Sequence, residues 1–371
     1  MSRSTRAIVS LQNLAHNIRV IRSGLDPDTK YLAVVKADAY GHGCVPVSRC
    51  ALANGASMLG VAFCDEALVL RRAGVDAPIL LLGASEEENF DAIIENDLMP
   101  AVFDAGTLRG LQEHAARLHK TCRVHLKADT GMHRIGFPTL CSFNEALELL
   151  PDCPNLAFAG LFTHFATSER ADQSFTLLQA ERFSAFADAA HAHGYRPLLH
   201  ASNSAAALHL PSLQLDMVRG GIAMYGCHPV GHDVPGVDLR PVMSLCTRVV
   251  MVKDLAAGES VSYGLTFTAD RPMRIATLPV GYGDGYRRAL SNKASVLLHG
   301  RRVRQIGTIC MDQMMVDVTE LPDAAIGDEA VLIGAQGGEC ITADELAALS
   351  GTISYEILLG IDQRVPRVYT E

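Results

Sequence analysis

The chain has 371 residues, of which 49% are hydrophobic and 20% are charged. This composition is that of a packed globular protein, and it excludes a disordered or fibrous chain, which would carry fewer apolar residues. The 32 basic and 41 acidic residues give a net charge of −9, and neither sign forms a long block. The sequence therefore predicts no general affinity for nucleic acid or for an anionic membrane surface.

Signals for export and for metal binding are absent from the sequence. The first ten residues lack the apolar core of a signal peptide, and no later run reaches ~18 uncharged apolar residues. We therefore expect a cytoplasmic protein without a membrane span. The ten cysteines include no CxxC pair and the 14 histidines are dispersed, so we expect neither a metal site nor disulfides.

From residue 31 onward, eight short apolar runs alternate with helical patterns. The runs cover residues 31–37, 57–63, 77–83, 98–103, 123–129, 156–165, 198–204 and 215–222. Continuous Val, Ile, Leu and Ala runs are typical of parallel strands that are buried on both faces. Residues 104–120 and 172–193 carry apolar residues at helical spacing behind aspartate caps. This alternation predicts an eight-stranded β/α barrel, with an open doubly wound sheet as the alternative because strand order cannot be deduced from one sequence.

The second part of the chain has a different texture. After Pro241, apolar runs are broken by Gly, Asp and Pro, and one helical pattern starts near Thr342. This texture favours a mostly antiparallel β domain. We therefore predict an α/β plus β protein, with a (β/α)8 TIM-type barrel over residues 1–240 and a C-terminal β domain over residues 241–371. Residues 1–10 are a candidate strand of the β domain.

Reactive residues follow several of the eight runs, at the strand ends where β/α barrels place their active sites. They are Lys36, Lys127, His164, Asn203 with Ser204, and Arg219. Burying such groups is costly unless they are paired or functional. We therefore expect these residues to gather around one site.

Lys36 lies in the string VVKADAYGHG, where an apolar strand delivers an amine to the barrel mouth. A desolvated lysine has a lowered pKa, which suits attack on a carbonyl group. Tyr40 and the pair Gly220-Gly221 offer a hydroxyl and close backbone N–H groups to a phosphate. An amine plus a phosphate cradle suggests pyridoxal phosphate. Spacing alone leaves open a phosphorylated sugar or a lysine aldolase.

The same string resembles the cofactor-lysine motif of bacterial alanine racemases. The resemblance continues in order over nearly the whole chain, through HLKADTGMHRIGF, THFAT, ASNSAA, VRGGIAMYG, VSYGLTF, GYGDGY, ICMDQMMVDVT and TISYEIL. The chain is thus similar to a family of enzymes that bind pyridoxal phosphate on a barrel and complete the site with a β domain.

The resemblance implies a two-base racemisation of alanine. Lys36 would hold the cofactor and transfer a proton on the D face, and Tyr263 of the partner subunit would serve the opposite face. A tyrosine hydroxyl is a poor base at neutral pH unless its surroundings favour the phenolate, and His164 and Arg219 are similar to family residues that form such a chain. Arg219 would face the pyridine nitrogen and, being unable to give up a proton, would leave that nitrogen neutral and disfavour transamination.

The resemblance also implies the binding residues. Cofactor contacts would come from Tyr40, His164, Asn203, Ser204, Arg219, Gly221, Ile222 and Tyr355. Arg134 and Met311 would bind the substrate carboxylate. Lys127 would be carbamylated and would orient Arg134, the alternative being an ordinary lysine with its stem along apolar surface.

The gate of the site carries both expected residues and departures from the family. Tyr282 and Tyr355 would limit substrate size, and Asp312 would support them. Thr308 stands where the family often has arginine, and Glu169 where aspartate is common.

The predicted function is therefore the interconversion of L-alanine and D-alanine by a homodimer with shared active sites. It would supply D-alanine for peptidoglycan or catabolise it. The alternatives are a racemase of serine or broader specificity, a decarboxylase on the same architecture, and a non-catalytic carrier of pyridoxal phosphate. The VSYG and ICMDQ motifs count against a carrier, because such proteins usually lack the β domain.

Overall fold

The structure is a computed structural model that describes residues 3–229 and 236–371. Its contacts divide the chain into two compact units. One unit comprises Leu14–Ala39 and Cys44–Leu239, and the other comprises Met1–Asn13, Tyr40–Gly43 and Arg240–Glu371. We call them the barrel unit and the β unit and describe each by itself.

The barrel unit contains eight parallel strands in the order β8-β7-β6-β5-β4-β3-β2-β9. They are β2 (Lys30–Val34), β3 (Met58–Val61), β4 (Ile79–Leu81), β5 (Leu98–Val102), β6 (Cys122–Lys127), β7 (Leu156–Phe162), β8 (Leu198–His200) and β9 (Met217–Gly220). The strands at the two ends of this order, β8 and β9, are joined by two backbone hydrogen bonds near their ends. The Asp216 N–H donates to Leu199 O at 3.1 Å, and the Arg219 N–H donates to Ser202 O at 3.0 Å. The ring is thus nearly closed, which confirms the predicted barrel, and the open-sheet alternative is wrong.

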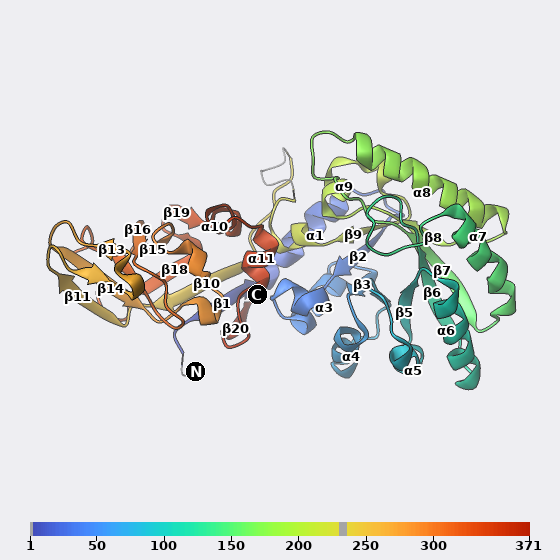
Figure 1. The fold of residues 1–371 in the computed structure, drawn as a ribbon, viewed down its shortest axis with the longest axis horizontal. Coiled ribbons are helices and arrows are strands. Elements are labelled where there is room, and N and C mark those ends of the chain that lie inside the picture. Colours follow the sequence, from blue (N-terminus) through green and yellow to red (C-terminus); the bar gives the residue numbers. More distant parts are fainter. Residues whose placement is uncertain (1–2, 230–235) are drawn as a thin grey trace. The chain divides into compact units, whose positions relative to one another are not determined.

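Helices lie outside this ring of strands (Figure 1). They are α1 (Leu11–Ser23), α3 (Cys44–Ala53), α4 (Cys64–Arg72), α5 (Phe90–Glu95), α6 (Ala105–Arg117), α7 (Leu140–Leu149), α8 (Ser174–Ala192) and α9 (Ser204–His209). Asp104 caps α6 by accepting the Thr107 N–H, as its place before the helical pattern indicates. No helix in residues 3–229 and 236–371 is long and apolar enough to cross a membrane.

The barrel interior contains a layer of aromatic and imidazole side chains. The rings of Phe162 and His200 stack, with centroids 4.8 Å apart and an interplanar angle of 4°, and His125 packs edge-on to His200. Gly160 makes room for this layer, because a Cβ atom there would lie 2.2 Å from His125 Nδ1. The inward-facing positions of the strands thus fill the barrel with side chains, and two of these side chains are histidines.

The β unit is built on a ten-stranded sheet in the order β11-β14-β17-β16-β15-β18-β10-β1-β20, with β19 paired to β18. The strands are β1 (Arg6–Ser10), β10 (Met243–Arg248), β11 (Met251–Leu255), β14 (Met273–Leu278), β15 (Ser295–Leu298), β16 (Arg301–Ile306), β17 (Met314–Asp317), β18 (Glu329–Gln336), β19 (Glu339–Ile341) and β20 (Arg367–Thr370). All neighbours are antiparallel except β1 and β20. The predicted mostly antiparallel C-terminal fold is confirmed. Two helices, α10 (Ala343–Ser350) and α11 (Ser354–Leu359), lie between β19 and β20 in the chain.

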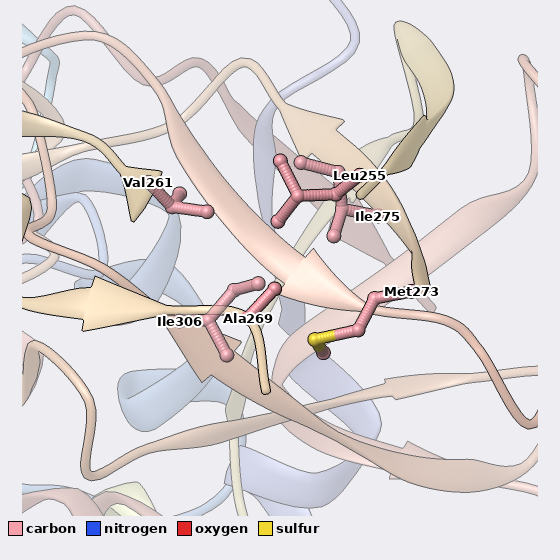
Figure 2. Packing of buried hydrophobic residues seen from close by; sticks show 6 residues of the cluster. All are labelled: Leu255, Val261, Ala269, Met273, Ile275 and Ile306. Carbon is pink, nitrogen blue, oxygen red and sulfur yellow. The ribbon is translucent and has the colours of Figure 1, made fainter. Parts of the chain in front are cut away.

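A small hairpin of β12 (Ser260–Val261) and β13 (Phe267–Thr268) stands beside this sheet. Its root is held by a buried apolar cluster in which side chains of the hairpin and of strands β11, β14 and β16 converge (Figure 2). The cluster consists of Leu255, Val261, Ala269, Met273, Ile275 and Ile306. Burial of these side chains anchors the hairpin at its base.

We predict that Gly160→Ala destabilises the barrel through overpacking, because the new Cβ atom would overlap the imidazole of His125. Overpacking of this kind costs about 1–3 kcal/mol. Urea unfolding should show the loss, with Gly24→Ala as the matched control, because a Cβ atom at Gly24 meets only Ile21 O, at 3.6 Å. Equal stability of the two variants would contradict the packing argument.

Candidate active site

Lys36 stands at the start of a left-handed turn that follows β2, labelled α2 (Lys36–Tyr40). The residues after it, through Tyr40, have φ values of 51–55°. Such angles are disfavoured for residues with a Cβ atom, so the turn needs support from outside. Glu66 provides it: its carboxylate accepts the Ala37 N–H at 2.5 Å and the Ala62 N–H at 2.6 Å. The backbone next to Lys36 is thereby fixed.

The surroundings of Lys36 favour the neutral amine. Burial lowers its pKa, the positive charge of Arg134 lowers it further, and only the carboxylate of Glu66 opposes the shift. A neutral amine has a free lone pair, so this side chain is suited to attack a carbonyl carbon or to accept a proton.

Lys127 ends strand β6 and is 4% exposed. Its Nζ atom lies 5.2 Å from the centroid of the Phe162 ring. Burial, followed by the charges of Arg134 and Arg219, lowers the pKa of Lys127 to about 7. The structure thus supports a lysine that is readily neutral near physiological pH, in contrast to an ordinary surface lysine.

Arg134 lies on a loop that Asp129 organises. One oxygen of the Asp129 carboxylate accepts the N–H groups of Gly131 and His133, both at 3.0 Å. The charge of Arg134 lowers the pKa values of Lys36, Lys127 and Arg219, so these four basic residues share one region of the barrel unit. Such a region favours anions such as phosphate and carboxylate.

Arg219 is buried on β9 and makes five hydrogen bonds. Its Nη1 atom donates to the carbonyl of His200 at 3.1 Å. Its Nη2 atom donates to the carbonyls of Thr163 and Ala201, both at 2.8 Å. The remaining two bonds go to imidazole nitrogens. Burial, then the charge of Arg134, lowers the pKa of Arg219 to about 9, so the group is still a cation at neutral pH.

The contacts of Arg219 determine the tautomers of three histidines. A guanidinium only donates, so His200 Nδ1, at 3.0 Å, and His164 Nδ1, at 3.1 Å, are acceptors. His200 must then carry its proton on Nε2 and donate it to His125 Nδ1, at 3.0 Å. Burial lowers the pKa of His125 to about 3, and burial with the charge of Arg219 lowers those of His164 and His200 well below the usual value. All three imidazoles are neutral.

Ser204 and the backbone after β9 form a second part of the barrel site. Ser204 Oγ accepts the Gly221 N–H at 2.9 Å and the Ala223 N–H at 3.3 Å. Asn203 caps α9 by accepting the Ala206 N–H at 3.1 Å. Gly221 precedes the short helix η4 (Ile222–Tyr225). A hydroxyl and closely spaced backbone N–H groups therefore gather here, as the sequence predicts for Ser204, Gly221 and Ile222.

The β unit presents the other predicted residues on its loops. Tyr263 is 72% exposed and Met311 is 52% exposed. Tyr282 N–H donates to Cys310 O at 3.0 Å, so the loops that carry Tyr282 and Met311 are joined. Gly281 permits this approach, because a Cβ atom there would lie 2.1 Å from Cys310 O.

A buried carboxylate holds these two loops. Asp284 is fully buried and pairs with Arg3 Nη1 at 2.6 Å and with Arg364 Nε at 2.7 Å. Arg364 also pairs with Asp312 at 2.7 Å. Burial acts to raise the pKa of Asp284, but the bonds from the two arginines outweigh it and the pKa is lowered. Asp312 is therefore tied through Arg364 to the loop that carries Tyr282.

Tyr40 and Tyr355 lie together within the β unit. Their ring centroids are 5.8 Å apart with an interplanar angle of 42°. The segment around Tyr40 is bound to the C-terminal chain, since Arg367 Nε donates to Gly41 O at 3.0 Å. Of the two departures from the family pattern, Glu169 is exposed, whereas Thr308 is buried.

Sequence reasoning missed five residues that organise the site. They are Glu66, His125, His200, Asp284 and Arg364. The sequence could have indicated His125 and His200, because each lies on an apolar strand. The alternation of side chains along a strand places both on the face that points into the barrel. No local signal indicates that Glu66 reaches the turn after Lys36, 29 residues earlier.

Two family models match the chain. One is described as "Alanine racemase, N-terminal domain" and matches residues 9–229, and the other as "Alanine racemase, C-terminal domain" and matches residues 242–369. Among curated relatives, an alanine racemase of Desulfovibrio desulfuricans is 45% identical and the match covers 98% of each chain. One of Symbiobacterium thermophilum is 46% identical over 99% of this chain and 97% of the relative.

Solved structures are similar over the full length as well. An alanine racemase of Clostridium difficile 630 superposes with a TM-score of 0.94 at 38% identity, covering 100% of this chain and 97% of that one. An alanine racemase from Bacillus anthracis with bound L-Ala-P has a TM-score of 0.93 at 37% identity, covering 100% and 96%.

We predict that Lys127 titrates near pH 7, because burial and neighbouring cations lower its pKa. An ordinary lysine titrates near pH ~10.4. The measurement is an NMR titration of cofactor-free protein labelled with 13C at the lysine ε carbons, in CO2-free buffer. Lys127→Arg assigns the signal, and Lys253→Arg assigns an exposed lysine as the control. A Lys127 signal that titrates together with bulk lysine would contradict the prediction.

Proposed function

The chain belongs to the alanine racemase family, and from this premise we propose that it interconverts L-alanine and D-alanine with pyridoxal phosphate as cofactor. The family and the isomerase class that the motifs predict are confirmed by the matches. The observation that carries the proposal is the match at 45% identity over 98% of both chains. The predicted site residues all lie within residues 9–229 and 242–369, which the two family models match. The bound L-Ala-P of the Bacillus anthracis structure supports an alanine-shaped substrate.

The residues present fit the cofactor. Arg219 uses Nη1 and Nη2 for all its hydrogen bonds to described residues, which leaves Nε–H for a ring nitrogen. Ser204, Gly221 and Ile222 suit a phosphate, and Lys36 suits the carbonyl carbon. Asn203 and His164 line the same part of the barrel unit. When bound, pyridoxal phosphate supplies an electron-withdrawing ring that acidifies the α-hydrogen of an amino acid.

Proton transfer falls to two side chains in this proposal. Lys36 Nζ, whose pKa is lowered by burial and by the charge of Arg134, removes the α-proton on the D face as the neutral amine and returns it as the ammonium ion. Tyr263 Oη of the partner subunit does so on the opposite face. Racemisation requires a proton-transfer group on each face of a planar α-carbon, or one group that can change sides, and the proposal assigns one face to each residue.

Arg219 sets the reaction type. Its guanidinium remains a donor at neutral pH, and the imidazoles on Nη1 and Nη2 are neutral acceptors. No group in this arrangement delivers a proton to the ring nitrogen. The electron sink is therefore weak, which favours return of the proton to the α-carbon over transamination.

Substrate binding uses the cationic region. Arg134 and the backbone N–H of Met311 would bind the carboxylate. We infer that Lys127 is carbamylated: its neutral amine, the reactive form, forms an N–C bond to CO2 and releases a proton to solvent. The carbamate anion offsets the crowding of Lys36, Arg134 and Arg219. That anion would orient Arg134.

The remaining proposals concern assembly and role. A cytoplasmic homodimer would complete each site, and Tyr40 and Tyr355 would contact the phosphate. Tyr282, Tyr355 and Asp312 would restrict the site to alanine, against serine or broader specificity. The product D-alanine would serve peptidoglycan or be catabolised.

The first test incubates purified holoenzyme with L-alanine and follows D-alanine by chiral chromatography, with L-serine in parallel. We expect racemisation of alanine, and a loss of at least about 10³-fold in Lys36→Ala, since the residue holds the cofactor and moves a proton. Lys253→Ala, at an exposed lysine, is the control. Holoenzyme that leaves L-alanine optically unchanged would refute the proposal.

The second test addresses the shared site. Mixing the inactive chains Lys36→Ala and Tyr263→Phe should restore part of the activity, because a heterodimer contains one site with both intact residues. Differently tagged chains purified in tandem prove that heterodimers are present. Heterodimers without activity would refute the assignment of Tyr263 to the partner's site.

A further inference from the structure

The turn that carries Tyr263 has an unfavourable backbone. It is the short helix η5 (Tyr263–Leu265), at the tip of the β12–β13 hairpin. Ser262 and Leu265 have φ values of +67° and +48°, in a region that residues with a Cβ atom avoid. Tyr263 itself is 72% exposed, so packing against its own chain does not orient its side chain. The direction of its hydroxyl depends on how firmly the turn is held.

Thr308 contacts this turn at three places. Its hydroxyl donates to the carbonyl of Tyr263 at 2.8 Å and bonds Thr266 Oγ1 at 3.1 Å. Its own carbonyl accepts the hydroxyl of Ser262 at 2.5 Å. Thr308 is 4% exposed, so water does not compete effectively for these bonds.

The donor and the acceptor of each hydrogen bond around Thr308 can be assigned. Thr308 has a single hydroxyl proton, which goes to the Tyr263 carbonyl, so Thr266 must donate to Thr308. Thr266 in turn accepts from Asn292 Nδ2 at 3.0 Å. The Asn292 carbonyl oxygen accepts the N–H of Gly307, the residue before Thr308, at 2.7 Å. The turn, Asn292 and Thr308 therefore form one closed network with its root next to the buried cluster of Figure 2.

We propose that Thr308 is a positioning residue, which holds the Tyr263 turn so that the Tyr263 hydroxyl is aimed for proton transfer. The inference rests on the proposed function, because it takes Tyr263 as the acid/base group on one face of the substrate. Thr308 does not touch the substrate. It acts through the backbone of Tyr263.

The test uses Thr308→Val, which keeps the shape and removes the hydroxyl, and Thr308→Ser, which restores it. Thr268→Val is the matched control, because among the described residues the Thr268 hydroxyl on the same hairpin bonds only Ser260, at 2.9 Å. Hydrogen exchange of residues 262–266, measured on protein without substrate, should quicken in Thr308→Val and remain slow in Thr308→Ser and Thr268→Val.

Isotope effects separate positioning from general damage. The equilibrium constant between L-alanine and D-alanine fixes the ratio of their kcat/KM values, and a substitution in the enzyme cannot change it. Loss of the hydrogen bond to Tyr263 should therefore lower both kcat/KM values together, by about tenfold. The step that has slowed is identified by α-deuterated substrates. Tyr263 removes the deuteron from L-alanine, so the kinetic isotope effect with α-deuterated L-alanine should rise in Thr308→Val. Lys36 removes the deuteron from D-alanine, and this step should limit the rate less, so the isotope effect with α-deuterated D-alanine should fall.

Thr266→Val, at an exposed position that tolerates change, removes the donor to Thr308 and should shift both isotope effects in the same directions, less strongly. Unchanged exchange and unchanged isotope effects in Thr308→Val would overturn the proposal. The proposal would also be overturned if Thr308→Val and Thr308→Ser lost activity equally while their isotope effects stayed at the wild-type values. If wild-type protein does not racemise alanine, the proposed function fails instead.

Discussion

The burial of one permanently charged guanidinium organises the barrel site. Arg219 is 4% exposed, and its hydrogen bonds go to backbone carbonyls and imidazoles rather than to a carboxylate. An isolated buried cation is very costly, and these acceptors offset the cost only while the ends of β7, β8 and β9 keep their relative places. The stability of the charge and the geometry of the strand ends therefore depend on each other.

The chemical character of the site follows from this charge. Burial lowers the pKa values of Lys127, His164 and His200, and the charge of Arg219 lowers them further. The pKa of Lys36 is lowered by burial and by the charge of Arg134. Neutral amines are nucleophiles and bases, and a region of unbalanced positive charge selects anionic ligands. A single arginine thus influences the Lys127 amine, two imidazoles and the ligand preference together.

The sequence predicts the fold, and the strand ends at which candidate residues lie, for a physical reason. Parallel strands buried on both faces must be continuous apolar runs, and the reactive residue that ends such a run, as Lys127 ends β6, must lie at the barrel mouth. What sequence reasoning missed are contacts that join distant segments. Nothing in the local pattern distinguishes Glu66 from an ordinary residue of a first helical turn, and the left-handed backbone after Lys36 contains no glycine until Gly41. These features depend on tertiary approach.

The two proposed acid/base residues are presented by the same physical device. Lys36 precedes residues with left-handed backbone, and Tyr263 is flanked by them. In each case one side chain from another segment binds the main chain of the turn: Glu66 accepts the Ala37 N–H, and Thr308 donates to the Tyr263 carbonyl. A strained turn projects its side chain in a direction that helices and strands do not offer, but it keeps that direction only under restraint. The partners of the turns, which contact the main chain of the turns, are therefore as much a part of the site's design as the residues they hold.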